Sequence, residues 1–117
     1  MPRRFVSCFF VFFLTLPLFA APLKIGVFIP GQREGSPIYE SLAAGAERFA
    51  SENPGSSVRV FEAGFNQAEW QEKLTGFVGS NRFDVILTSN PSLPDLIQAI
   101  APLFPSQKFL CLDGYKA

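Results

Sequence analysis

The sequence predicts an α/β fold in which a parallel sheet carries helices on both faces. Four short apolar runs each end in small polar residues, and a helical pattern follows each of the first three runs. The runs begin near residues 24, 58, 84 and 108, so the intervals of 34, 26 and 24 residues each hold one strand and one helix. Right-handed crossovers between such units give parallel strands with helices on the two faces.

The first 21 residues have the composition of an export signal. Two arginines precede an apolar run of fifteen residues, 5–19, which ends in Ala20-Ala21. A basic start, an apolar centre and small residues at the end are typical of a secretory signal peptide. The run is shorter than the roughly 20 residues that a spanning helix needs. We therefore expect residues 1–21 to be a signal peptide, with an uncleaved membrane anchor as the alternative.

The composition of the remaining chain excludes several classes of function. After residue 21 there are eight Lys and Arg against ten Asp and Glu, a formal charge of −2, so nucleic acid is not an expected partner. The sequence has no histidine, and Cys111 is the single cysteine after the signal. An internal disulfide, a zinc site and a histidine-based catalytic pair are thus excluded within this part of the chain. We expect no metal or cofactor, and we expect Cys111 to be a small buried hydrophobic residue.

The first strand is predicted at 24–29 and is nearly continuous in apolar residues, as a strand covered on both faces requires. The loop after it has two glycines, but their spacing fits neither a dinucleotide motif nor a P-loop. Ser36 and Pro37 are expected to open a helix that ends at Asn53-Pro54-Gly55. Tyr39 lies in its first turn, where it would either stack on a ligand ring or pack against the sheet edge. The predicted buried face consists of Ile38, Leu42, Ala46 and Phe49.

The second unit pairs a strand at 58–62 with a helix that ends at 79–81. Asn66 is expected to cap this helix, and Glu69 completes a pattern similar to a capping box. Phe65, just before the cap, would act either as a lid over a ligand or as a hydrophobic staple. The helical stripe Trp70, Leu74 and Phe77 favours a place in the core, with Trp70 as a ligand platform being the alternative.

The third and fourth units place polar residues at strand ends. A strand at 85–87 is followed by the polar stretch 88–92, and ligands of open α/β sheets bind outside the carboxyl ends of strands. Ser92 is expected to cap the next helix, with Asp95 three residues on. The fourth strand is predicted at 108–113, so Asp113 would accept hydrogen bonds from a ligand or would be a turn aspartate before glycine. The predicted inward face of the third helix consists of Leu93, Leu96, Ile97 and Ile100.

Three separated motifs resemble one known family. Gly-Phe-Asn-Gln-x-Glu-Trp at 64–70, Thr-Ser-Asn-Pro at 88–91 and Phe-Leu-x-Leu-Asp-Gly-Tyr at 109–115 are similar, in order and spacing, to the basic membrane protein family. These are PnrA-like substrate-binding proteins of ABC transporters. The resemblance covers about residues 23–117 and implies a type I periplasmic-binding-protein-like lobe. It also implies export to the periplasm or the outer face of the cytoplasmic membrane.

In this family two α/β lobes close over a purine nucleoside or a similar ligand and pass it to a permease. The resemblance therefore implies a binding protein without enzymatic activity. Asp113 stands at a strand end where the family places an acid that contacts the ligand. The predicted ligand-binding residues are Tyr39, Phe65, Asn66, Ser89, Asn90 and Asp113.

Two departures from the family pattern bear on these expectations. In the loop after the first strand, the best-known members carry acidic residues and a Ser-Phe-Asn motif, whereas this sequence reads Gly-Gln-Arg-Glu-Gly-Ser-Pro-Ile-Tyr at 31–39. Either Tyr39 supplies the aromatic contact or the ligand differs. The chain is also short for a two-lobed receptor. We expect residues 22–117 to be the N-terminal part of the first lobe, with the second lobe absent, as in a fragment or the product of a truncated gene. The functional alternatives are a nucleoside or sugar hydrolase on a similar sheet, and a membrane-anchored surface antigen.

Overall fold

A computed structural model describes residues 21–80 and 82–114. The predicted signal residues 1–20 and the positions 81 and 115–117 lie outside the described residues. None of the helices in the described part of the chain is long and apolar enough to span a membrane. The elements in chain order are β1 (Lys24–Ile29), α2 (Pro37–Glu52), β2 (Ser57–Glu62), the short 3₁₀ helix η1 (Gln67–Glu69), α3 (Trp70–Ser80), β3 (Val85–Thr88), α4 (Leu93–Ile100), the 3₁₀ turn η2 (Ala101–Leu103) and β4 (Lys108–Cys111).

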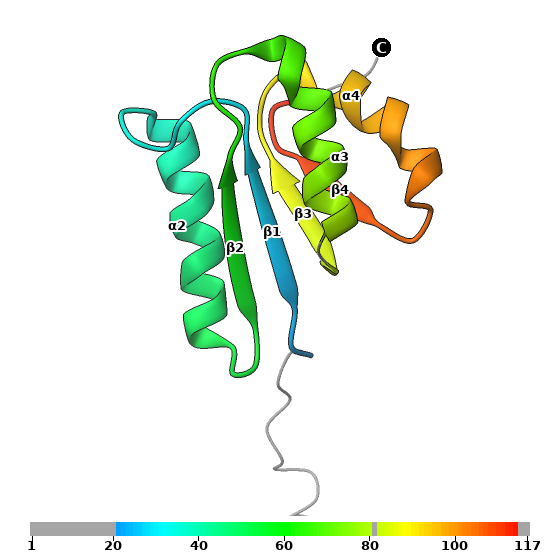
Figure 1. Ribbon diagram of the computed structural model, residues 1–117. Helices are drawn as coiled ribbons and strands as arrows, with labels where there is room; N and C mark the ends of the chain where they lie inside the picture. The colour runs from blue at the N-terminus through cyan, green and yellow to red at the C-terminus, as the bar shows by residue number, and fades with distance from the viewer. Residues whose placement is uncertain (1–20, 81, 115–117) are drawn as a thin grey trace, which may run out of the picture.

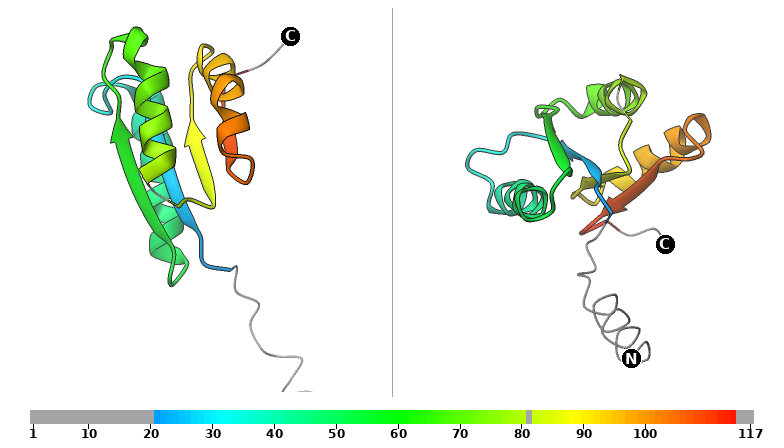
Figure 2. Two further views of the ribbon diagram at one scale, coloured as in Figure 1. Left: turned by 45° about the vertical axis from the view of Figure 1, so that its right-hand side comes forward. Right: turned by 90° about the horizontal axis from the view of Figure 1, so that it is seen from below.

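The four strands form one parallel sheet in the order β2-β1-β3-β4. Helix α2 covers one face of the sheet, and α3 and α4 cover the other (Figures 1 and 2). The predicted α/β fold with helices on both faces is therefore confirmed. The order follows from right-handed crossovers, because the chain moves outward from β1 first to one side and then to the other.

Alternation along β1 divides the core into two layers. Val27 and its neighbours on the same side pack against α2, whereas Phe28 points to the layer under α3 and α4. Phe28 contacts the rings of Phe61 and Phe77, with ring centroids 5.8 and 6.3 Å apart. Trp70 is 4% exposed in this layer, so its prediction as a core residue is confirmed.

Helix α2 begins and ends where the sequence predicts, but its buried face is shifted. The Ser36 side chain accepts a hydrogen bond from the Tyr39 backbone N–H, and Asn53 forms the C-cap. Ile38 is 59% exposed, which contradicts its predicted burial. Tyr39, one position further along the first turn, takes the inward position and packs against the layer under α2.

Three predictions at the carboxyl side of the sheet are wrong in detail. Ser92 makes no side-chain capping bond to α4, because its own backbone is already in the helical region (φ −82°, ψ −16°) and lacks the extended conformation of a cap. Strand β4 ends at Cys111 instead of Asp113, and the chain turns there. Cys111 is half-buried instead of fully buried, because β4 is an edge strand of the described sheet.

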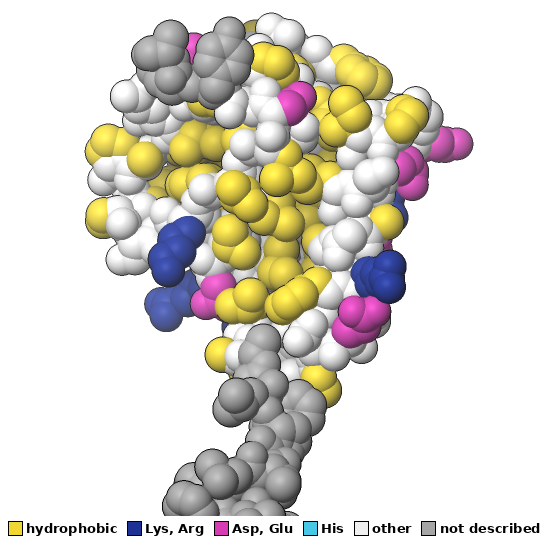
Figure 3. Space-filling model, turned by 180° about the vertical axis from the view of Figure 1, so that it is seen from behind, with side chains coloured by type: hydrophobic (Ala, Val, Ile, Leu, Met, Phe, Trp, Pro, Cys, Tyr) yellow, Lys and Arg dark blue, Asp and Glu magenta, His cyan; other side chains and the backbone are white. Residues whose placement is uncertain are grey.

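The two sheet faces are covered unequally. Helix α2 lies over β2 and β1, so the same face of β3 and β4 has no helix over it in the described part of the chain (Figures 1 and 2). Hydrophobic side chains gather on the molecule's surface on this side (Figure 3). We call this surface the apolar groove. It lies between α2 and the sheet, and Leu110 continues it on the edge strand, where it pairs in register with Leu87. Its lining includes Ile25, Leu42, Phe49, Val85, Leu87 and Leu112.

Candidate functional site

The carboxyl ends of the strands point to one edge of the sheet (Figure 1). Most of the predicted ligand-binding residues lie in the loops and the helix turn at this edge. Tyr39 approaches this edge from the first turn of α2, and Phe65 from the loop after β2. Ser89 and Asn90 follow β3, and Asp113 follows β4, the neighbouring strand. Parallel pairing alone brings these loops together, because every strand ends at the same edge.

The side chains of Asp113 and Ser89 form a direct hydrogen bond. The Ser89 hydroxyl donates to Asp113 Oδ1 over 2.7 Å, and Ser89 is 1% exposed. The loops behind them are joined by the Leu112 N–H, which donates to the Thr88 carbonyl over 3.0 Å. A buried hydroxyl thus fixes one carboxylate oxygen of Asp113 and leaves the second oxygen for other donors.

Gly114 brings the loop after β4 close to α4. A Cβ atom at this position would lie 2.5 Å from Pro94 Cγ and 2.6 Å from Cys111 Sγ, so only glycine allows this approach. The Cys111 thiol donates to the Asn90 carbonyl over 3.5 Å, and partial burial raises its pKa. The close contacts at Gly114 help to fix the turn that carries Asp113.

Asn90 lies at the centre of the site and contacts helix α2, its own loop and strand β4. Its side-chain Nδ2 donates to the Tyr39 hydroxyl over 3.3 Å, and its Oδ1 accepts from the Ser92 N–H over 2.8 Å. Its φ of 152° is in a region that residues with a side chain rarely adopt. The Tyr39 hydroxyl in turn donates to the Pro30 carbonyl over 3.5 Å.

Tyr39 and Phe65, which we call the aromatic pair, approach each other over Gly31. A Cβ atom at Gly31 would lie 3.2 Å from Phe65 Cε1 and 3.4 Å from Tyr39 Cε2. Gly31 has a φ of 150°, which glycine adopts without strain. Phe65 is 73% exposed, whereas Tyr39 is half-buried. The aromatic pair therefore offers ring surface to solvent at the carboxyl edge.

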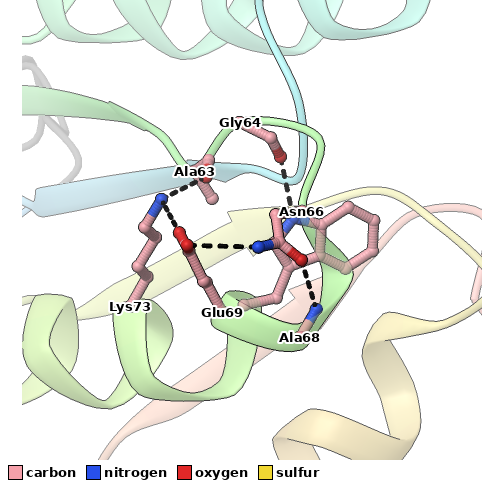
Figure 4. A network of polar contacts seen from close by, with 7 residues as sticks. Ala63, Gly64, Asn66, Ala68, Glu69 and Lys73 are labelled. Carbon is pink, nitrogen blue, oxygen red and sulfur yellow. Dashed lines mark hydrogen bonds and ion pairs between the residues drawn. The ribbon is translucent and has the colours of Figure 1, made fainter.

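Asn66 is bonded within its own turn (Figure 4). Its Oδ1 accepts from the Ala68 N–H over 3.2 Å, and its Nδ2 donates to Glu69 over 3.1 Å. The predicted capping role is confirmed, although the capped element is the short helix η1 that leads into α3. Both ends of its amide are engaged in these local contacts.

Sequence reasoning did not identify several residues that shape the site from behind the predicted ligand contacts. Gly31 and Gly114 allow close approaches that a side chain would block, and the Pro30 carbonyl receives the Tyr39 hydroxyl. Thr88 is fully buried and donates to the Phe28 carbonyl over 2.7 Å, which ties β3 to β1 beside the site. The available signal was a glycine two or three residues beyond a strand end, which occurs at Gly31 after Ile29 and at Gly114 after Cys111.

A hollow of about 560 Å³ lies away from the strand ends, between β2 and α3. It is lined by charges of both signs, including Arg59, Glu72 and Lys73. None of the six predicted ligand-binding residues lines it. In the described residues, no group of three or more His, Cys, Asp or Glu side chains could hold a metal ion.

The fold and the polar edge define a class of protein, namely α/β lobes that bind a small ligand outside the carboxyl ends of parallel strands. A family model described as Bmp, ABC transporter substrate-binding protein PnrA-like, matches residues 23–117. The chain belongs to this family. The resemblance predicted from the three sequence motifs is confirmed over the same residues.

Proposed function

We propose that this protein is the solute-binding component of an ABC transporter and that its ligand is a purine nucleoside or a closely related small molecule. Membership of a substrate-binding family supports the general class. The nucleoside assignment rests on one observation, which is the presence of two aromatic rings and a fixed carboxylate on the same edge of the sheet.

Each part of a nucleoside has a matching group in this proposal. The aromatic pair, Tyr39 and Phe65, offers ring surface on which a planar base can stack. The free oxygen of Asp113 accepts a hydrogen bond from a ribose hydroxyl or a base N–H, while Ser89 orients the carboxylate. Asn66 and Asn90 contribute to the site through the loops that they shape.

The proposed mechanism is binding without covalent chemistry. The ligand would be held against this edge by a second lobe, as the family resemblance implies, and would be released to a permease when the lobes open. Export through residues 1–21 would place the protein in the periplasm or on the outer face of the cytoplasmic membrane.

The first test is calorimetric titration of the exported protein with inosine, adenosine, guanosine, uridine and ribose. We expect the purine nucleosides to bind more tightly than uridine, and ribose to bind least. The ring area that can stack on the aromatic pair is larger in a purine than in a pyrimidine, and ribose has no base. Asp113→Asn should weaken nucleoside binding about 10- to 100-fold, the range expected when a hydrogen bond to a charged group is lost.

Asp84→Asn is the matched control for this test. Asp84 accepts a hydrogen bond from the Lys24 N–H at the opposite, amino end of the strands, so the same change should leave affinity unaltered. Failure of the wild-type protein to bind any nucleoside would refute the ligand assignment. Recovery of free base after incubation would instead favour the hydrolase alternative.

A further inference from the structure

Both side-chain polar groups and the backbone carbonyl of Asn90 are hydrogen-bonded within the protein. Its Oδ1 accepts from Ser92, its Nδ2 donates to Tyr39, and its carbonyl accepts from both the Leu93 N–H and the Cys111 thiol. Among these groups only Nδ2, with two hydrogens, keeps donor capacity. This pattern is typical of a residue that holds other residues in place.

The backbone of Asn90 supports the same conclusion. A φ of 152° is unfavourable for any residue with a Cβ atom, whereas glycine would adopt it readily. The sequence nevertheless has asparagine here, so the side chain must supply contacts that offset the strain. Those contacts are the bond to the Ser92 N–H, which closes the turn before α4, and the bond to the Tyr39 hydroxyl.

The Tyr39 hydroxyl is held from two directions. It accepts from Asn90 Nδ2 and donates to the Pro30 carbonyl, so the hydroxyl's one hydrogen is already used. The ring, not the hydroxyl, is then the part of Tyr39 that can meet a ligand. Its Cε2 edge lies against Gly31, opposite Phe65.

We infer that Asn90 is a positioning residue that fixes the ring of Tyr39 over Gly31, so that the aromatic pair accepts a planar ligand group through its ring surfaces. The ligand in this inference rests on the proposed function, whereas the position of the Tyr39 ring rests only on the contacts described above. It differs from the sequence prediction of Asn90 as a ligand contact, because Asn90 acts through Tyr39.

The test compares Asn90→Gly, Tyr39→Phe and the double variant. Glycine suits the backbone at position 90, so Asn90→Gly should fold and lose only the side-chain contacts. Nuclear Overhauser effects between the Tyr39 ring and the Gly31 α-protons report the ring position without any ligand. Titration with inosine reports the consequence for binding.

We expect the Tyr39 to Gly31 Overhauser effects to weaken or vanish in Asn90→Gly. Each single variant should bind inosine about fivefold more weakly, the effect of losing one neutral hydrogen bond. The double variant should have the same affinity for inosine as the single variant that binds it more weakly, because both changes break the same contact between Asn90 and Tyr39. In Tyr39→Phe, the side-chain amide resonances of Asn90 should shift.

Asn53→Gly is the matched control, since Asn53 caps the far end of the same helix α2 and bonds the Phe49 carbonyl. It should change neither the ring contacts nor the affinity. Unchanged Overhauser effects in Asn90→Gly, or multiplicative losses in the double variant, would overturn the inference. If the wild-type protein does not bind inosine, the nucleoside proposal fails and the Overhauser comparison alone decides the role of Asn90.

Discussion

Gly26 sets the distance between the sheet and helix α3. It lies on β1 on the side of Phe28, and a Cβ atom there would be 3.0 Å from the rings of both Phe77 and Phe83. Those two rings contact each other, with centroids 4.8 Å apart, so neither can move away without disturbing the other. A single methyl group at position 26 would therefore overpack this layer.

We predict that Gly26→Ala lowers the free energy of unfolding by about 1–3 kcal/mol, the usual range for overpacking a core. Denaturant unfolding followed by the fluorescence of Trp70 measures this change. Gly76→Ala is the matched control, because a Cβ atom at Gly76 meets nothing within 4 Å. Since Gly76 is an exposed helical position, alanine there should stabilise by roughly 0.5–1 kcal/mol. A neutral or stabilising Gly26→Ala would show that the two rings relax.

Sequence reasoning at the residue scale succeeded where a residue type has one dominant role. Ser36 before Pro37 identified the N-cap of α2, and Asn66 was identified as a cap. It failed for Ser92, because two neighbouring residues can both cap a turn and only the backbone conformation decides between them. Asn90 takes that role through Oδ1, at a φ that asparagine rarely adopts.

At the scale of elements, Lys73 ties α3 to the end of β2 (Figure 4). Its ammonium group donates to the Ala63 carbonyl over 2.8 Å and pairs with Glu69 over 2.8 Å. The hydrogen bond from Lys73, followed by its positive charge, lowers the pKa of Glu69 below its ordinary value of 4.5. Asn66 also donates to Glu69, so the Glu69 carboxylate joins the cap of η1 to Lys73 in the first turn of α3.

We predict that the stability difference between wild type and Glu69→Gln depends on pH. Because the folded-state pKa of Glu69 is lowered, its ionised form stabilises the fold fully above pH 4.5. That contribution disappears as pH falls through the lower, folded-state pKa. Melting temperatures measured from pH 7 to pH 3 should therefore show a small difference that shrinks with acid, since the pair is exposed.

Glu72→Gln removes the same charge three residues further along, in the first turn of α3, and is the control for the pH series. If both variants lose stability in parallel at every pH, the effect belongs to the overall charge of this segment and not to the ion pair between Lys73 and Glu69.

Most elements were predictable because their patterns are strong. The strands at 24–29, 58–62, 85–87 and 108–113 match β1 to β4 to within two residues at either end. The spatial order of the strands was not predicted, because the order depends on which edge of the sheet each crossover reaches. Strand β4 ends two residues before its predicted end, and the close approach of Gly114 to Pro94 just beyond it is a tertiary contact that no local pattern records.

At the scale of the whole molecule, the sheet leaves the apolar groove open on the side of α2. Right-handed crossovers explain this asymmetry. The connection from β1 to β2 places α2 on one face, and both connections toward β3 and β4 place their helices on the other. Leu110 and Leu112 therefore stand 51% and 61% exposed at the edge of an otherwise apolar surface. An apolar surface of this kind binds hydrophobic dyes and favours association.

We predict that the isolated chain without residues 1–21 binds the dye ANS through this groove, and that Leu112→Lys lowers the dye fluorescence by about half, since Leu112 lines the groove directly. The same variant should reduce association measured by light scattering, because an added charge disfavours apolar contact between chains.

Leu103→Lys is the matched control. Leu103 is 66% exposed in η2, after α4 on the opposite side of the sheet, so it changes net charge equally and leaves the groove intact. An equal loss of fluorescence in both variants would place the dye elsewhere, and a wild-type chain that binds no ANS would mean that the groove is covered in solution.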